Sequence, residues 1–169
     1  MVQCRAVGEF IRKSGAALQC QFMDVLVVNK QIQFVQADAL IVNLFEGAET
    51  PSGATGALDA ALAASPGVSD DGAISQLIAL GDFKGKLNEV AVVYSRNLIP
   101  APRVIVVGLG KASLFNADRA RQASGSAVRR ARDRGCKRVA TIIHGAGAGG
   151  LDPRSAAQAT VEGALLGAY

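Results

Sequence analysis

The sequence has little of the chemistry that metal-dependent and nucleophilic enzymes need. It holds one histidine, His144, no tryptophan and three cysteines among 169 residues. Three cysteines are too few, and odd in number, for a disulfide scaffold. One histidine excludes a histidine-based metal site or a Cys/His zinc cluster. A Walker loop and a Gly-x-Ser-x-Gly elbow are also missing, so the common nucleotide and acyl-transfer motifs are excluded.

Long apolar runs are missing as well. No stretch of 18 apolar residues occurs, so the sequence predicts no transmembrane helix and no membrane partner. Residues 1–22 carry Arg5, Arg12 and Lys13 without a continuous apolar segment behind them, which is unlike a secretory signal. We therefore expect a cytoplasmic protein.

The residues that are present predict one globular domain. Half of them are hydrophobic and 19% are charged, and 30 alanines and 19 glycines point to closely packed helices and tight turns. A chain of this size buries roughly 70% of the surface that its unfolded form exposes.

Positive charge is concentrated in one segment. Residues 119–138 carry eight arginines and lysines against Asp133, a net charge of +7, whereas the remainder of the chain carries −3. Such a helix can neutralise the phosphates of a nucleic acid. The alternative is a solvated outer face of an ordinary helix, which the absence of interleaved aromatic residues favours.

Strand-like and helix-like segments alternate along the chain. Short runs rich in β-branched residues predict strands over 22–28, 32–36, 39–45, 89–95, 103–107 and 139–143. Helical spacing and capping residues predict helices around 58–62, at 74–81, from Asn116 to Gly135 and from Pro153 onward. This pattern predicts an α/β fold of three layers, a mixed β-sheet flanked by helices.

Two glycine-rich loops follow predicted strands. Gly145 and Gly147 begin a run that formally satisfies G-x-G-x-x-G, and Gly108 and Gly110 precede Lys111. Open α/β sheets bind ligands at the carboxyl ends of strands, so both loops are candidate ligand loops. The alternatives are a surface linker and a tight turn without a ligand. His144 lacks an obvious acid or nucleophile partner, so we expect a core or capping residue.

The stretch Asp38-Ala39-Leu40-Ile41-Val42-Asn43 resembles the signature of macro domains. That resemblance implies ADP-ribose binding, with Asp38 reading the adenine amino group and Asn43 at the end of the strand. The following residues 44–47 lack the second asparagine and the glycine run of that signature.

A second resemblance covers most of the chain. Residues 37–47, the stretch Gly81-Asp82-Phe83-Lys84-Gly85-Lys86, the stretch Val107-Gly108-Leu109-Gly110-Lys111 and residues 150–153 and 162–166 resemble the N-terminal domain of the leucyl aminopeptidase (cytosol aminopeptidase) family. The resemblance implies a macro-domain-like fold and a parent enzyme that is a cytoplasmic, hexameric aminopeptidase with two divalent metals, zinc or manganese. The metal ligands and catalytic residues of the family lie in its second domain.

The resemblance implies that this chain contributes a non-catalytic domain that serves subunit assembly and access to the active site. No catalytic or metal-binding residue is expected here. We expect a leader or tag-like segment at 1–22, the macro-like domain at 23–152, and at 153–169 a helix leading toward the catalytic domain. Its partners are then the catalytic domain and other subunits. A stand-alone nucleotide-binding module and a nucleic-acid-binding module that uses 119–138 are the alternatives.

Overall fold

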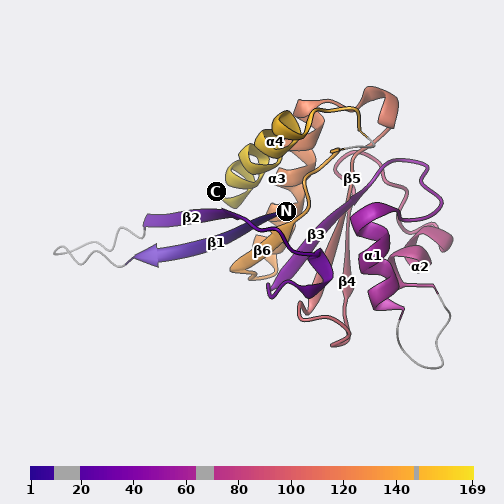
Figure 1. Ribbon diagram of the computed structural model, residues 1–169, viewed down its shortest axis with the longest axis horizontal. Coiled ribbons are helices and arrows are strands. Elements are labelled where there is room, and N and C mark those ends of the chain that lie inside the picture. The colour runs from indigo at the N-terminus through magenta and orange to yellow at the C-terminus, as the bar shows by residue number, and fades with distance from the viewer. Residues whose placement is uncertain (10–19, 64–70, 147–148) are drawn as a thin grey trace.

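A six-stranded mixed sheet forms the centre of the computed structural model, which describes residues 1–9, 20–63, 71–146 and 149–169. Its strands follow the spatial order β2-β1-β6-β3-β5-β4 (Figure 1). They are β1 (Val2–Glu9), β2 (Cys20–Val27), β3 (Ala39–Leu44), β4 (Val90–Tyr94), β5 (Arg103–Gly108) and β6 (Arg138–Thr141). The inner strands β6, β3 and β5 run parallel, and antiparallel strands flank them on both sides.

Helices cover both faces of this sheet (Figure 1). One face carries the 3-10 helix η1 (Ile32–Phe34), α1 (Gly53–Leu62) and α2 (Ala73–Ala79), and the other carries α3 (Ala117–Asp133) and α4 (Pro153–Ala168). A second 3-10 helix, η2 (Ala112–Leu114), precedes α3. The predicted three-layer α/β fold with a mixed sheet is therefore confirmed.

The middle residues of β3 and β5 are apolar because both faces of these strands are covered. In β3, Leu40 and Val42 point into the core beneath α1 and α2, whereas Ile41 points into the core beneath α3 and α4. In β5, Val106 and Ile105 divide in the same way. This alternation defines two separate hydrophobic cores, one on each side of the sheet.

Helices α3 and α4 approach each other through small residues. Gly163 lies against the backbone of Arg121, and Gly167 lies against the backbone of Gly125, so closely that a Cβ at either α4 glycine would overlap the other helix. The helix extends to Ala168, and Gly167 near its end still lies against α3.

Two expectations for the first forty residues are wrong. Residues 1–9 are not a leader or tag-like segment, because β1 lies between β2 and β6 and the side chain of Val2 is 1% exposed. Of the rest of the expected leader, 20–22 begin β2, and 10–19 lie outside the described residues. The expected strand at 32–36 is a 3-10 helix, η1. There Ile32 and Val35, three residues apart, both enter the core, and strand alternation would separate them.

The remaining elements match their expected positions. The two predicted N-caps are also present: Asn116 accepts a hydrogen bond from the backbone N–H of Arg119, and Asp152 from those of Arg154 and Ser155. Gly135 follows α3 with a φ of 72°, as a C-terminal glycine should. In the described part of the chain, no helix has both the length and the apolar character needed to cross a membrane.

Candidate functional site

A cleft of about 330 Å³ opens at the carboxyl ends of β3 and β6. The end of β3 contributes Asn43 and Phe45, the beginning of α1 contributes Thr55, and the loop after β6 contributes Ile143 and Gly145. A second cavity of about 500 Å³ adjoins it and is lined partly by Met1 and Ile32. The first cleft is the place where α/β sheets bind ligands, so it is the candidate site.

Asn43, which lines this cleft, is paired with the buried His144 behind it. Asn43 Nδ2 lies 2.9 Å from His144 Nδ1, and the imidazole is fully buried. Because an amide nitrogen can only donate, Nδ1 accepts and the ring proton sits on Nε2, 3.4 Å from Thr141 Oγ1. The His144 backbone N–H donates to Thr160 Oγ1 in α4. The expectation of a core histidine is confirmed, and the pair joins β3 and β6 to α4.

Burial lowers the pKa of His144 from its usual 6.5 to about 4. Its protonated form is therefore disfavoured in the folded state. Between these two values the unfolded chain binds a proton that the folded chain excludes, so stability is fully present above pH 6.5 and falls as the pH drops toward 4.

We expect this one residue to remove about 3 kcal/mol of unfolding free energy between pH 7 and pH 4. Urea unfolding of the wild type and of His144→Gln at several pH values measures it. The variant loses hydrogen bonds and should be less stable at pH 7, but its stability should depend less on pH over this interval. Equal pH dependence of the two proteins would show that the folded state does not exclude the proton.

Asp38 lies at the other end of β3 from this cleft. Its Oδ2 accepts hydrogen bonds from the backbone N–H groups of Lys137, at 2.7 Å, and Arg138, at 2.8 Å. The carboxylate thus fixes the turn between α3 and β6, next to the start of β3. The structure does not bring Asp38 together with Asn43 or with the glycine loops.

The loop at Gly108 and Gly110 is bonded to the rest of the protein through its backbone. Three consecutive N–H groups donate to carbonyl oxygens: Gly108 to Glu89 at 2.8 Å, Leu109 to Leu44 at 2.9 Å, and Gly110 to Gly85 at 2.9 Å. None of these three donors is therefore left for a phosphate, which binds such loops through free N–H groups.

The two glycine motifs that the sequence singled out meet here. Gly85 and Lys86 lie directly against Gly108, where a Cβ would overlap the Lys86 carbonyl oxygen. Glu89 holds the facing segment, since its Oε2 accepts from the backbone N–H groups of Lys84 at 3.1 Å and Lys86 at 2.9 Å. Gly108 thus allows these two backbones to touch, and Gly85 allows a similar approach to the backbone of Phe45.

The loop that begins at Gly145 is covered by an aromatic ring. Phe115 lies over both Gly145 and Gly149, and any Cβ on either glycine would collide with its ring. Phe115 also packs edge-on against Phe45, with ring centroids 5.2 Å apart. The ring therefore covers one face of these two glycines. Gly147, the other candidate in this loop, lies outside the described residues.

The N-terminus of α4 is also already occupied. Asp152 accepts from two backbone N–H groups, and its hydrogen bonds with Ser155 lower the pKa of its carboxyl group, so it stays ionised at neutral pH. A helix N-terminus attracts anions, but an ionised carboxylate in that place repels a phosphate.

Sequence reasoning missed two residues of this region. Thr55 is buried, and its hydroxyl donates to the Asn43 carbonyl oxygen, which ties α1 to the end of β3. Phe115 gave no signal beyond its place directly before the N-cap Asn116. Metal-binding side chains do not gather anywhere in the described ranges, where no group of three or more His, Cys, Asp or Glu could hold an ion.

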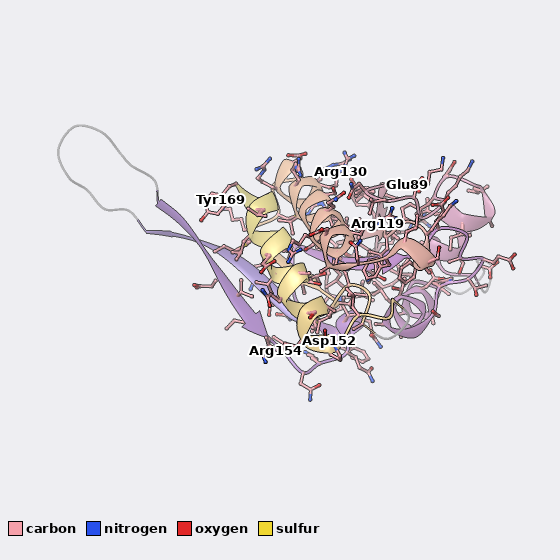
Figure 2. All side chains as sticks on the ribbon, turned by 90° about the horizontal axis from the view of Figure 1, so that it is seen from above. Glu89, Arg119, Arg130, Asp152, Arg154 and Tyr169 are labelled. Atoms are coloured by element: carbon pink, nitrogen blue, oxygen red, sulfur yellow. The ribbon has the colours of Figure 1, made fainter. Side chains whose placement is uncertain are left out.

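The basic segment forms one exposed surface at the C-terminal end of α3 and the turn into β6. Arg129, Arg130, Lys137 and Arg138 are exposed there. Figure 2 shows Arg130 on α3, and shows Tyr169 and Arg154 toward opposite ends of the neighbouring α4. Arg121, near the N-terminal end of α3, instead contacts Asp118 of the same helix and Glu162 of α4, and so links α3 to α4.

The fold is that of a macrodomain. The macrodomain of Mycobacterium tuberculosis DarG superposes with a TM-score of 0.62 at 16% identity, over 80% of this chain and 86% of that one. The bottromycin maturation enzyme BotP gives a TM-score of 0.53 at 24% identity, over 79% of this chain and 23% of that one. At these identities the similarity defines the architecture, a three-layer macro-like domain.

The sequence comparisons define the family. Residues 41–169 match the model of the cytosol aminopeptidase family, N-terminal domain. A probable cytosol aminopeptidase of Alkaliphilus oremlandii is 33% identical over 147 residues, which are 87% of this chain and 28% of that protein. The chain therefore belongs to the cytosol aminopeptidase family and corresponds to its N-terminal domain. It spans little more than a quarter of that relative's length.

Proposed function

We propose that this domain is a non-catalytic part of a leucyl aminopeptidase and serves subunit assembly and access to the active site. One observation carries the proposal: polar groups at the carboxyl ends of β5 and β3 are bonded within the protein. The N–H groups of Gly108, Leu109 and Gly110 donate to protein carbonyls, and the Asn43 side chain is paired with His144. Donors that are engaged in this way are not free to stabilise a reacting group.

Peptide hydrolysis then belongs to a second domain. In this proposal that domain carries two divalent metals, zinc or manganese, and the whole enzyme works as a cytoplasmic hexamer. The relatives are named cytosol aminopeptidases, and the Alkaliphilus protein is more than three times as long as the matched region. Leu166 and Tyr169, at the end of α4, are 75% and 80% exposed and offer an apolar surface for that domain.

The pure chain is expected to show no aminopeptidase activity. Hydrolysis of leucine p-nitroanilide should stay at the level of a metal-only blank when the chain is supplied with manganese or zinc. The same assay with a full-length relative is the positive control. Turnover by the chain that survives repurification and is lost on denaturation would sink the proposal.

A second candidate function is binding of a nucleic acid through the basic surface. The exposure of Arg129, Arg130, Lys137 and Arg138 favours it, because these charges stand where a phosphate backbone could reach them. Binding of a DNA duplex should then weaken steeply as salt increases, and Arg129→Gln with Arg130→Gln should reduce the salt dependence. Absence of binding at low salt would eliminate this candidate.

A further inference from the structure

A separate cleft lies at the C-terminal end of α1, whereas the strand-end cleft lies at its N-terminal end. It measures about 260 Å³ and lies between the end of α1, the start of α2 and the end of β4. Leu62, Val93 and Leu98 form its apolar wall, and Asp71, Ser95 and Arg96 are its polar members. This volume is below the roughly 300–1,000 Å³ of typical ligand pockets, so the occupant is a small molecule.

Ser95 carries a hydroxyl group that the protein does not satisfy. The residue is 1% exposed, and in the described part of the chain its Oγ is the buried side-chain polar atom without a hydrogen-bond partner. Its backbone groups are bonded, the N–H to Pro102 at 3.1 Å and the carbonyl to Leu98 at 3.0 Å. An unpaired buried hydroxyl destabilises a protein, so its retention beside a cleft points to a ligand.

The turn after Ser95 presents a cation to the same cleft. Arg96 and Asn97 both adopt left-handed backbone conformations, with φ values of 51° and 66°, and the Leu98 N–H closes the turn onto Ser95. These are the dihedral signs of a type I′ turn, in which arginine is unfavourable and asparagine or glycine is usual. The turn places an arginine on the lining of the cleft, next to Ser95 in the chain.

The polar members of the cleft have opposite charges. Arg96 and Ser95 can bind a carboxylate, the guanidinium through charge and the hydroxyl as a hydrogen-bond donor. Asp71, from the segment before α2, can accept from an ammonium group. Leu62, Val93 and Leu98 line the same cleft with apolar side chains. The complementary molecule is small, zwitterionic and apolar in its remaining part.

We propose that this cleft binds a free α-amino acid with an aliphatic side chain. The carboxylate contacts Ser95 and Arg96, the ammonium group contacts Asp71, and the aliphatic side chain packs on Leu62, Val93 and Leu98.

The test is an NMR titration of the full chain with L-leucine. The backbone amides of Asp71, Ser95 and Arg96 should shift together and saturate. Leucinamide, which lacks the carboxylate, N-acetyl-leucine, which lacks the ammonium group, and D-leucine should each bind at least about tenfold more weakly. The comparison of these four ligands uses the unmodified chain and needs no substitution. Absence of a saturable shift at these amides with L-leucine overturns the proposal, and so does equal affinity for leucine and its two blocked forms.

Two variants separate a ligand role from a structural one. Ser95→Ala should raise the melting temperature, because it removes an unpaired hydroxyl, and should weaken L-leucine binding about tenfold. Arg96→Asn keeps a residue that tolerates the left-handed turn and should weaken binding as much. Arg130→Gln removes an equal charge on α3 and should leave binding unchanged. A Ser95→Ala variant that binds L-leucine as tightly as the parent contradicts the proposal, whatever its melting temperature.

Discussion

A chain that starts at Met23 is expected to be at least about 3 kcal/mol less stable than the whole domain, or not to unfold cooperatively. The deletion removes β1, which pairs with β2 along its full length and with β6 on its other side. Burial of Val2 alone contributes about 1.5–3 kcal/mol, and β2 loses its sole neighbour in the sheet order. Urea unfolding followed by circular dichroism measures the effect.

The chain offers a matched control for this deletion. Val2 and Val27 are paired residues of β1 and β2, but their exposed fractions are 1% and 82%. Val2→Ala should lower the unfolding free energy by about 2 kcal/mol, and Val27→Ala by no more than about 0.5 kcal/mol. If the Met23 chain and the Val2→Ala variant were as stable as the parent, β1 would not be part of the folded sheet.

Gly108→Ala is expected to lower the unfolding free energy by about 3 kcal/mol or more. The added methyl group would overlap the Lys86 carbonyl oxygen and the backbone of Gly85. Backbone atoms cannot rotate away as a flexible side chain can. The contact that must open also holds the hydrogen bonds of Gly108 to Glu89 and of Gly110 to Gly85.

Gly47→Ala is the matched control for this substitution. Gly47 has a φ of 80° and nothing within 4 Å of an added Cβ, so the substitution introduces backbone strain without a collision. It should lower the unfolding free energy by about 1–2 kcal/mol. Thermal or urea unfolding of both variants makes the comparison. A Gly108→Ala variant no less stable than Gly47→Ala would mean that the two loops are not in contact.

The layers of the fold follow from local patterns in the sequence. The fully apolar run in β5 predicted a doubly covered central strand, and Asn116, Gly135 and Asp152 marked helix boundaries that the structure confirms. Such signals depend on a residue and its near neighbours. They can therefore be recognised in the sequence without knowledge of the tertiary structure.

The places where the sequence misled depend on distant partners. Segment 1–9 has weak periodicity, and its strand exists because β6 and β2 flank it. Ile32 to Gln36 is rich in strand-forming residues, but burial of Ile32 and Val35 in one core selects a 3-10 turn. Pairing of His144 with Asn43, 101 positions away, and cover of Gly145 by Phe115 are likewise tertiary events.

The candidate site was also predictable only in part. The sequence placed Asn43, Gly108, Gly110 and Gly145 at strand ends, and the structure finds them there. What no local pattern could indicate is that the donors of the Gly108 loop are bonded to Gly85 and Glu89. The motif is the same for a ligand loop and for two touching backbones, and only the partner distinguishes them.

The most direct test of the account is a titration of the chain with ADP-ribose, followed by calorimetry and by NMR of the same sample. It measures whether the loops at the strand ends of this macro-like domain bind a nucleotide. We predict no saturable heat and no shift of the amides of Asn43, Gly108, Gly110 and Gly145, because the N–H groups of the Gly108 loop and the side chain of Asn43 are bonded within the protein. Saturable binding with shifts at those amides would contradict a non-catalytic, assembly-serving domain and would establish a nucleotide-binding module.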